Sequence, residues 1–271
     1  MRSLKAIEHL RVKPGDKAGL AKIDPDFCGD LTKEDAEGQL AEDLEALGHL
    51  QQQLYAEDRR ALLVVLQGID TAGKDGVIRK VMTGFNPQGC VVTPFKKPAG
   101  EELEHDYLWR VHAACPRRGE IGVFNRSHYE DVLVVRVHDL VHGKRLERRY
   151  DTINNFERML DDEGTHVVKF FLWISRDEQR RRLQDRLQDP EKNWKFSEAD
   201  LKERERWDEY MEAFELALTR CSTDHAPWWI VPANRKWFRN WMVARVLRHT
   251  LESFDMKWPK AKIDVSKVRV A

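Results

Sequence analysis

One segment of the sequence combines glycines and a lysine in an order suited to binding phosphate. Gly68-Ile-Asp-Thr-Ala-Gly73-Lys74 fits the pattern G-x-x-x-x-G-K and directly follows the continuous apolar run Ala61 to Leu66. Glycines allow backbone N–H groups to turn toward phosphate oxygens, and the lysine can reach the same oxygens. A glycine-rich turn with a surface lysine is the alternative, and the strand before the segment argues against it. We therefore predict a P-loop whose phosphate contacts come from Gly68, Thr71, Ala72, Gly73, Lys74, Asp75 and Gly76.

The position after the lysine departs from the usual P-loop. Most such loops carry Ser or Thr there to bind magnesium, whereas this chain has Asp75. Asp70, inside the loop, is the natural substitute, because a carboxylate among backbone donors and phosphates can bind magnesium or orient an attacking oxygen. An aspartate that only caps the turn is the structural alternative. The sequence thus predicts a divalent metal at Asp70, magnesium first and manganese second.

A second polar segment follows another predicted strand, Ile121 to Phe124. It reads Asn125-Arg126-Ser127-His128-Tyr129-Glu130-Asp131. Neighbouring parallel strands end at the same edge of a sheet, so these groups should face the P-loop. Arginine matches phosphate geometry well, although Arg126 could instead form a surface salt bridge. We expect Asn125, Arg126 and Glu130, together with Arg186 farther along the chain, to contact a nucleotide.

Further basic residues could extend the phosphate site. Arg79 and Lys80 fall on the predicted P-loop helix, and Lys96 follows the short predicted strand Val91 to Pro94. An extended polyanion needs such a row of cations. Later in the chain, Arg182 and Arg186 belong to a strongly charged helical stretch, which predicts a lid that closes on the reacting phosphates.

The arrangement of these segments predicts an α/β domain of three layers with a five-stranded parallel sheet. Residues 1–32 read as an irregular arm on the surface, and residues 33–271 as one domain without a linker. A long helix should follow Thr32, with further helices from Lys74, over 101–114, over 145–160 and over 237–254. Strands at 61–66, 91–94, 121–124, 167–174 and 228–231 alternate with them, which is typical of a parallel sheet with its ligand site at the carboxyl ends. The charged stretch 176–220 suits a mobile lid better than a crossover packed on the sheet.

Composition excludes several classes of protein. Lys plus Arg equals Asp plus Glu at 46 each, so no global field favours nucleic acid or an anionic membrane. Apolar runs are far shorter than the roughly 20 residues needed to cross a bilayer, and the N-terminus lacks the apolar core of a signal peptide. The four cysteines are scattered, which suits reduced thiols. We expect a cytoplasmic protein that binds neither nucleic acid nor membrane.

Taken together, three motifs resemble the family-2 polyphosphate kinases. They are Gly68-Ile-Asp-x-x-Gly-Lys-Asp-Gly76, Phe124-Asn-Arg-Ser-His-Tyr-Glu130, and Ser175-Arg-Asp-Glu-Gln179 followed by Arg182 and Arg186. The resemblance covers about residues 33–254. It implies a fold similar to thymidylate kinase and transfer of a phosphoryl group from inorganic polyphosphate to a nucleotide with magnesium.

The resemblance also implies roles for individual residues. The family's loop aspartate falls on Asp70, its P-loop lysine on Lys74, its strand-end arginine on Arg126 and its lid arginine on Arg182. Many members carry aspartate where this chain has Asn125; the form found here looks like the subgroup that phosphorylates both AMP and ADP.

Two alternatives stay open at this point. An ATP-dependent nucleoside or nucleotide kinase shares the P-loop and the lid, and a non-catalytic protein that binds nucleotide or polyphosphate would explain Asp75 and Asn125. In the enzyme reading the substrates are polyphosphate and adenine or guanine nucleotides. Assembly into a homo-oligomer is expected, with apolar residues near Trp237 available for it.

Overall fold

A parallel sheet of five strands forms the centre of the molecule. The computed structural model describes residues 4–261, 263 and 268–269; the remainder of the predicted arm and of the predicted domain lies outside the described residues. The strands pair in the order β2-β3-β1-β4-β5, all parallel. Their bounds are β1 (Ala61–Gln67), β2 (Cys90–Pro94), β3 (Ile121–Asn125), β4 (Thr165–Trp173) and β5 (Trp228–Pro232). The predicted number, direction and approximate position of the strands are confirmed.

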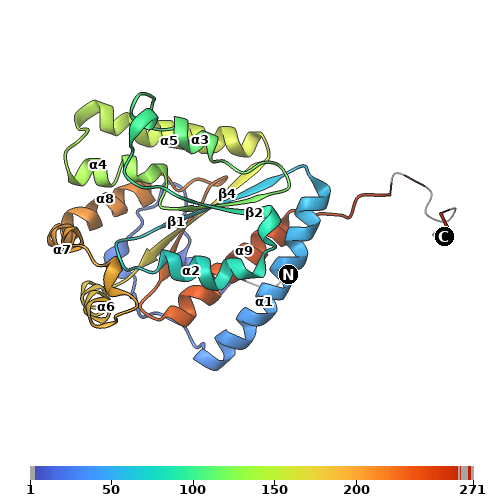
Figure 1. Cartoon of the computed structure of the whole chain (residues 1–271), viewed down its shortest axis with the longest axis horizontal. Helices are drawn as coiled ribbons and strands as arrows, with labels where there is room; N and C mark the ends of the chain where they lie inside the picture. The colour runs from blue at the N-terminus through green and yellow to red at the C-terminus, as the bar shows by residue number, and fades with distance from the viewer. Residues whose placement is uncertain (1–3, 262, 264–267, 270–271) are drawn as a thin grey trace.

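Helices cover both faces of the sheet (Figure 1). On one face lie α1 (Lys33–Glu57), α2 (Lys74–Val81) and α9 (Lys236–Ser253). On the other lie α3 (Trp109–Ala113), α4 (Val134–Val137), α5 (Gly143–Asp162) and α8 (Trp207–Arg220). Two helices, α6 (Arg176–Gln188) and α7 (Glu198–Glu205), lie at the end where the strands finish. Short 3-10 helices are η1 (Glu8–Leu10), η2 (Leu20–Lys22), η3 (Met82–Gly84), η4 (Pro87–Gly89), η5 (Gly100–Leu103), η6 (His128–Asp131) and η7 (Asn193–Lys195).

Helix α1 begins where the sequence predicts. The Thr32 side chain accepts a hydrogen bond from the Asp35 backbone N–H, which caps the first turn. Its apolar stripe, including Leu40, Leu47 and Leu54, is buried in the core. The helix packs along α9, so the stripe attaches it to the main body.

The helix predicted over residues 101–114 is wrong. Instead, the 3-10 turn η5 and the five-residue helix α3 are separated by the non-helical residues 104–108, which include Asp106. The Asp106 carboxylate accepts a hydrogen bond from the Leu108 backbone N–H at 2.9 Å. Aspartate competes with helical hydrogen bonds in this way, and the helix restarts only beyond it.

The lid predicted over residues 176–220 is too wide. Helix α8 buries Ala213, Phe214 and Ala217, and the Phe214 ring lies 4.5 Å from Phe171 of β4. It is therefore part of the layer packed on the sheet. By contrast, α7 has no buried residue among those described, and α6 has only a few buried residues, so the predicted lid is limited to these two helices.

The N-terminal arm is irregular apart from η1 and η2, but it does more than lie on the surface. Leu4, Ile7, Leu10 and Leu20 are buried in the core. The Val12 backbone N–H donates to the Trp228 carbonyl at 2.9 Å, which fixes the arm to β5. The sparse apolar residues of the arm were too irregularly spaced to reveal this burial.

Helix α9 lies in the interior of its layer and is apolar around most of its circumference. Phe238 and Trp241 are buried, so these apolar residues cover the chain's own core. Among the described residues, no helix combines the length and the apolar character that a membrane span requires.

Candidate active site

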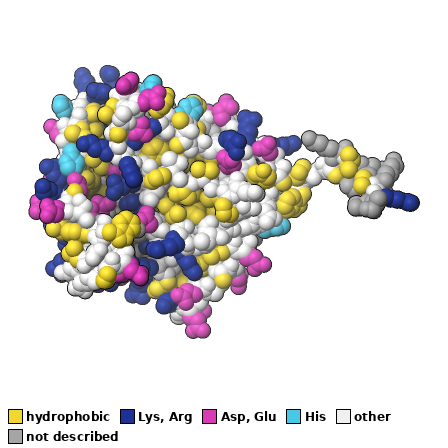
Figure 2. Space-filling model, viewed as in Figure 1, with side chains coloured by type: hydrophobic (Ala, Val, Ile, Leu, Met, Phe, Trp, Pro, Cys, Tyr) yellow, Lys and Arg dark blue, Asp and Glu magenta, His cyan; other side chains and the backbone are white. Residues whose placement is uncertain are grey.

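A large pocket opens at the carboxyl ends of the strands. Its volume is ≈1010 Å³, and it extends from the loop after β1 to α6, η7 and the start of α9. Figure 2 shows Lys and Arg side chains gathered at the end of the molecule where α6 and α7 lie, whereas the centre of the visible face carries few charges. We call this cavity the strand-end pocket.

The lining of the strand-end pocket is strongly basic. Four acidic residues line it: Asp70, Asp75, Asp185 and Glu191. Among the described residues, eleven basic ones do so: Lys74, Arg79, Lys80, Lys96, Lys97, Arg126, Arg182, Arg186, Lys192, Lys236 and Arg239. Such an excess of positive charge in one concavity suits a ligand with several negative charges.

The loop between β1 and α2 has the backbone of a tight anion-binding turn. Gly73, at the N-cap of α2, has φ +108°, and a Cβ added there would meet the Arg239 Nη1 atom at 1.9 Å. Glycine is therefore required twice, by the backbone and by the neighbour. Thr71 and Gly76 also line the pocket, whereas Gly68 and Ala72 lie behind the lining.

Lys74 is buried at the base of the pocket. Its Nζ atom donates to the Gly68 carbonyl at 2.6 Å and to the Ile69 carbonyl at 3.4 Å. Burial, with the nearby Arg126 charge second, lowers the pKa of Lys74 to about 8 despite the opposing effect of Asp70 and other carboxylates. A polyanion in the pocket would favour the charged ammonium.

Arg126 joins the tip of β3 to the loop after β1. Its Nη2 group donates to the Asp70 Oδ1 atom at 2.7 Å. Burial opposes the charge of Arg126, but the carboxylates of Asp70 and Glu130 outweigh it and raise the pKa of this guanidinium. The structure thus brings together two residues that the sequence places on separate strand ends.

Asn125 and Asp75 are also direct neighbours. The Asn125 Nδ2 group donates to the Asp75 Oδ1 atom at 2.9 Å. The two residues that depart from the commoner patterns therefore form one contact at the pocket wall.

Glu130 lies behind the lining, close to the basic residues at the base. Burial raises the pKa of its carboxyl, while the charges of Arg126 and Lys74 and a hydrogen bond from Gln67 act in the opposite direction. The neighbouring Asp131 does not share this position, because its Oδ1 atom accepts from Arg149 at 3.0 Å.

A buried cluster of charged and polar side chains packs against the segment that follows β3. The Lys169 Nζ atom donates to the Glu157 Oε2 atom at 2.5 Å and to the Tyr129 hydroxyl at 2.8 Å, and His128 lies 3.1 Å from Glu157 Oε1. All four side chains are fully buried. Because Tyr129 and His128 follow Arg126 closely, this cluster fixes the backbone that presents the arginine, whose φ is +61°.

The structure places the predicted lid arginines in different roles. Arg186 lines the pocket and pairs with Asp200 of α7 at 3.0 Å. Arg182 also reaches the pocket, but its guanidinium donates to backbone carbonyls of the P-loop, Thr71 at 2.9 Å and Ala72 at 3.0 Å. Arg180 pairs with Asp177 on the helix surface.

Sequence reasoning did not predict the basic residues that α9 contributes to the pocket, Lys236 and Arg239, both near the start of this helix. Burial, followed by the charges of Arg182 and Arg79, lowers the pKa of Arg239 to about 10. The sequence contained a signal for these two residues. They are three positions apart on the helix that follows a predicted parallel strand, so both could lie near the carboxyl end of the sheet.

The carboxylates at the pocket suit a metal that is shared with a substrate. Among the described residues, no group of three or more His, Cys, Asp or Glu could hold a metal by itself. Asp70 nevertheless offers a partly exposed carboxylate beside Lys74. Magnesium is commonly held by one or two carboxylates together with substrate phosphates, so the residues present fit such a site.

Comparisons with known proteins agree with this geometry. At 50% identity, the chain is similar to the AMP/ADP-polyphosphate phosphotransferase of Meiothermus ruber, over 97% of this chain and 99% of the relative. It is 46% identical to the ADP-polyphosphate phosphotransferase of Rhodopseudomonas palustris, over 93% of this chain and 92% of the relative.

A solved structure shares the fold over almost the whole chain. The crystal structure of Polyphosphate Kinase 2 from Arthrobacter aurescens TC1 superposes with a TM-score of 0.92 at 45% identity, covering 96% of this chain and 93% of that chain. The family model described as Polyphosphate kinase 2 (PPK2) matches residues 30–259, which include the P-loop, the β3 end and α6. The chain is therefore a phosphotransferase that belongs to the Polyphosphate kinase 2 (PPK2) family.

Proposed function

We propose that this protein transfers phosphoryl groups between inorganic polyphosphate and the nucleotides AMP and ADP. The observation that carries the proposal is the strand-end pocket, in which a P-loop opens into a cavity lined by eleven basic residues. The Meiothermus ruber relative is named for activity on both AMP and ADP, which supports the same acceptor range here.

The shape and charge of the pocket favour polyphosphate over ATP as the donor. Basic side chains come from α2, from the segment after β2, from the α6 region and from α9, so they can follow an extended chain of phosphates. The apolar side chains that line the pocket, among the residues the structure describes, are those of Pro94, Phe95 and Trp194. An adenine-binding slot would normally need a larger apolar surface.

We place the acceptor nucleotide near the end of β3. Arg126 would bind its phosphate as a bidentate donor, with Asn125 and Glu130 nearby and Arg186 approaching from α6. Adenine and guanine nucleotides are both included in this proposal, because the contacts named here all address phosphate and none addresses the base.

The proposed mechanism is direct, in-line transfer without a covalent phosphoenzyme. Lys74 neutralises charge on the donor phosphates, and Arg126 holds the acceptor phosphate in line while its hydrogen bond orients the Asp70 carboxylate. Asp70 would hold a divalent metal, magnesium or manganese, which when bound would neutralise negative charge on the phosphates. Arg79, Lys80 and Lys96 bind the more distant phosphates of the donor.

The first test is nucleotide chromatography after incubation of the protein with magnesium, polyphosphate and AMP. A parallel reaction contains ATP in place of polyphosphate. We expect ADP and then ATP in the polyphosphate reaction. ADP formed only in the ATP reaction would indicate an ATP-dependent nucleotide kinase, and no product in either would indicate a non-catalytic binding protein.

Three wider features complete the proposal. Residues 33–271 act as one catalytic unit with the arm 1–32 attached, in the cytoplasm.

The protein assembles into a homo-oligomer. The exposed residues Val91 and Val92 on the edge strand β2 support this, because unpaired strand edges readily associate. Light scattering would check the assembly, with a monomer as the contrary result.

A further inference from the structure

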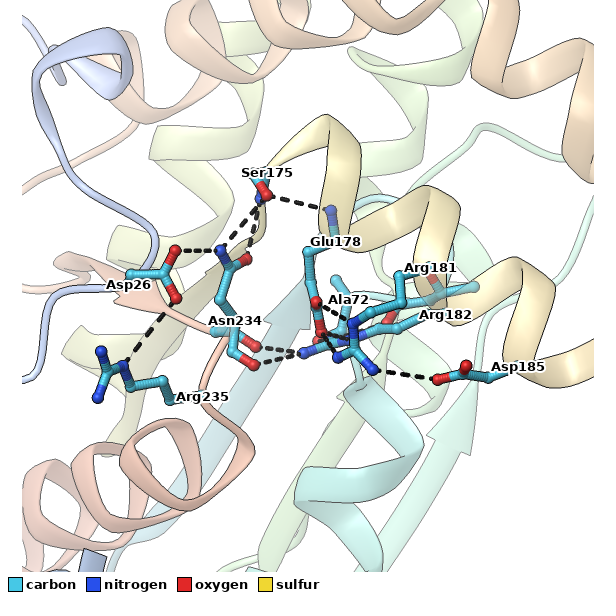
Figure 3. A network of polar contacts seen from close by, with 11 residues as sticks. Asp26, Ala72, Ser175, Glu178, Arg181, Arg182, Asp185, Asn234 and Arg235 are labelled. Atoms are coloured by element: carbon cyan, nitrogen blue, oxygen red, sulfur yellow. Dashed lines mark hydrogen bonds and ion pairs between the residues drawn. The ribbon is translucent and has the colours of Figure 1, made fainter.

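Arg182 uses every N–H group of its guanidinium within the protein. Its Nη1 group donates to the Thr71 and Ala72 carbonyls at 2.9 and 3.0 Å. Its Nη2 group donates to the Ala233 and Asn234 carbonyls at 2.6 and 3.1 Å. The fifth donor, Nε, binds Glu178 Oε1 at 2.6 Å (Figure 3). An arginine side chain has five N–H donors, so this set is complete.

The acceptors on the P-loop side belong to a strained segment. Thr71 has φ +67°, in the left-handed region that β-branched residues seldom adopt. Its hydroxyl is buried and has no hydrogen-bond partner among the described residues, so none of these contacts of the side chain stabilises this conformation. The hydrogen bond from Arg182 to the Thr71 carbonyl stabilises this conformation instead, because it fixes the peptide group that follows Thr71.

The other acceptors are themselves held in place. The Asn234 Oδ1 atom accepts from the Ser175 backbone N–H at 3.0 Å, and its Nδ2 group donates to Asp26 of the arm at 2.8 Å (Figure 3). The Asn234 backbone N–H donates to the Pro25 carbonyl at 3.2 Å. Arg182 therefore connects the P-loop to the end of β5 and, through Asn234, to the N-terminal arm.

We propose that Arg182 is a positioning residue that holds the P-loop in its strained, phosphate-binding conformation, and that it does not contact the transferred phosphoryl group. To reach a phosphate oxygen, the guanidinium would have to release the Thr71 and Ala72 carbonyls and disturb the loop that binds the donor. This inference rests on the proposed function for the identity of the donor, but the loop geometry is independent of it.

One test is a crystal structure of the wild-type protein with magnesium and tripolyphosphate. We expect phosphate oxygens on the P-loop and at Lys74, with the Arg182 donors still on Thr71 and Ala72. A direct hydrogen bond between the Arg182 guanidinium and a phosphate oxygen would overturn the proposal. This test needs no variant to fold and no turnover.

A double-mutant cycle tests the same point in solution. Arg182→Lys keeps the charge but cannot serve five acceptors, and should lower kcat/KM for polyphosphate about 100-fold, as misplaced groups do. Thr71→Gly removes the strain that Arg182 compensates, so in that background the loss should shrink to about tenfold. Equal losses in both backgrounds would overturn the proposal.

Two controls keep this result distinct from other failures. Arg180→Lys changes an exposed arginine of the same helix and should leave kcat/KM unchanged, and thermal unfolding checks that every variant folds. The cycle is also measured on tripolyphosphate affinity. If the two substitutions are coupled in tripolyphosphate affinity but the protein does not phosphorylate AMP, the role of Arg182 is supported and the proposed function is contradicted. If they are coupled neither in affinity nor in kcat/KM, the role of Arg182 is contradicted.

Discussion

The Arg126 guanidinium and the Asp70 carboxylate lie 2.7 Å apart, although 56 positions separate them in the chain. Asp70 follows β1 and Arg126 follows β3, and these strands are adjacent in the sheet. The contact places the proposed metal-binding carboxylate beside the proposed acceptor arginine. Several consequences can be measured.

Replacing Asp70 by Asn should lower turnover at least about 100-fold, because a charge that acts on the transferring phosphates is lost. The amide still accepts from Arg126, so the fold should be retained. Activity is measured over a series of magnesium concentrations, with Asp177→Asn as a matched surface control. Near-normal turnover of Asp70→Asn would remove this residue from the mechanism.

We expect kcat/KM for polyphosphate to fall as the pH rises through about 8, because burial lowers the pKa of Lys74 to about 8. The profile of kcat/KM reports groups of the free enzyme, in which the ammonium then becomes neutral. Lys74→Arg stays charged, so whatever activity it retains should lack this fall. A flat wild-type profile through pH 8 would contradict the prediction.

The fall in kcat/KM cannot come from an effect of Lys74 on stability, because deprotonation of Lys74 makes the folded state more stable as the pH rises. Between about 8 and the ordinary value of 10.5, the unfolded chain holds the Lys74 proton and the folded chain does not. Stability rises with pH wherever the unfolded state binds more protons. Thermal unfolding measured alongside activity therefore separates the two.

Arg239 should contribute to donor binding, since it packs against Gly73 at the pocket. Arg239→Gln is expected to raise KM for polyphosphate about tenfold, the worth of one charged hydrogen bond, with KM for AMP unchanged. The salt dependence of polyphosphate binding should also become weaker, by analogy with nucleic-acid binding. Arg180→Gln is the control, and an equal rise in both KM values would contradict this assignment.

The buried Glu157–Lys169 pair should dominate the stability of the β3 end. Glu157→Leu leaves the Lys169 ammonium buried without its carboxylate and should lower the free energy of unfolding by about 3–5 kcal/mol. Adding Lys169→Met should recover part of this loss, because neither charge of the pair then remains buried. Urea unfolding measures both; a double variant less stable than Glu157→Leu would refute the interpretation.

Several of these residues could be found from sequence, because local patterns determine them. The apolar run before Gly68 and the glycine spacing predicted the P-loop, and the polar residues after Phe124 predicted a second strand end at the same edge. The long helix predicted to follow Thr32 begins there. Strand periodicity and turn chemistry depend on neighbours within a few residues, so they are legible in one chain.

Tertiary structure decided the rest, because hydrogen-bond partners and burial depend on distant segments. Arg182 looked like a lid arginine, but its acceptors come from the P-loop and from the end of β5. The N-terminal arm looked peripheral, yet Asp26 binds Asn234 and Leu10 is buried. The sequence by itself determined which residues could bind phosphate; only the fold determined which guanidinium groups face the pocket and which are used to hold its walls.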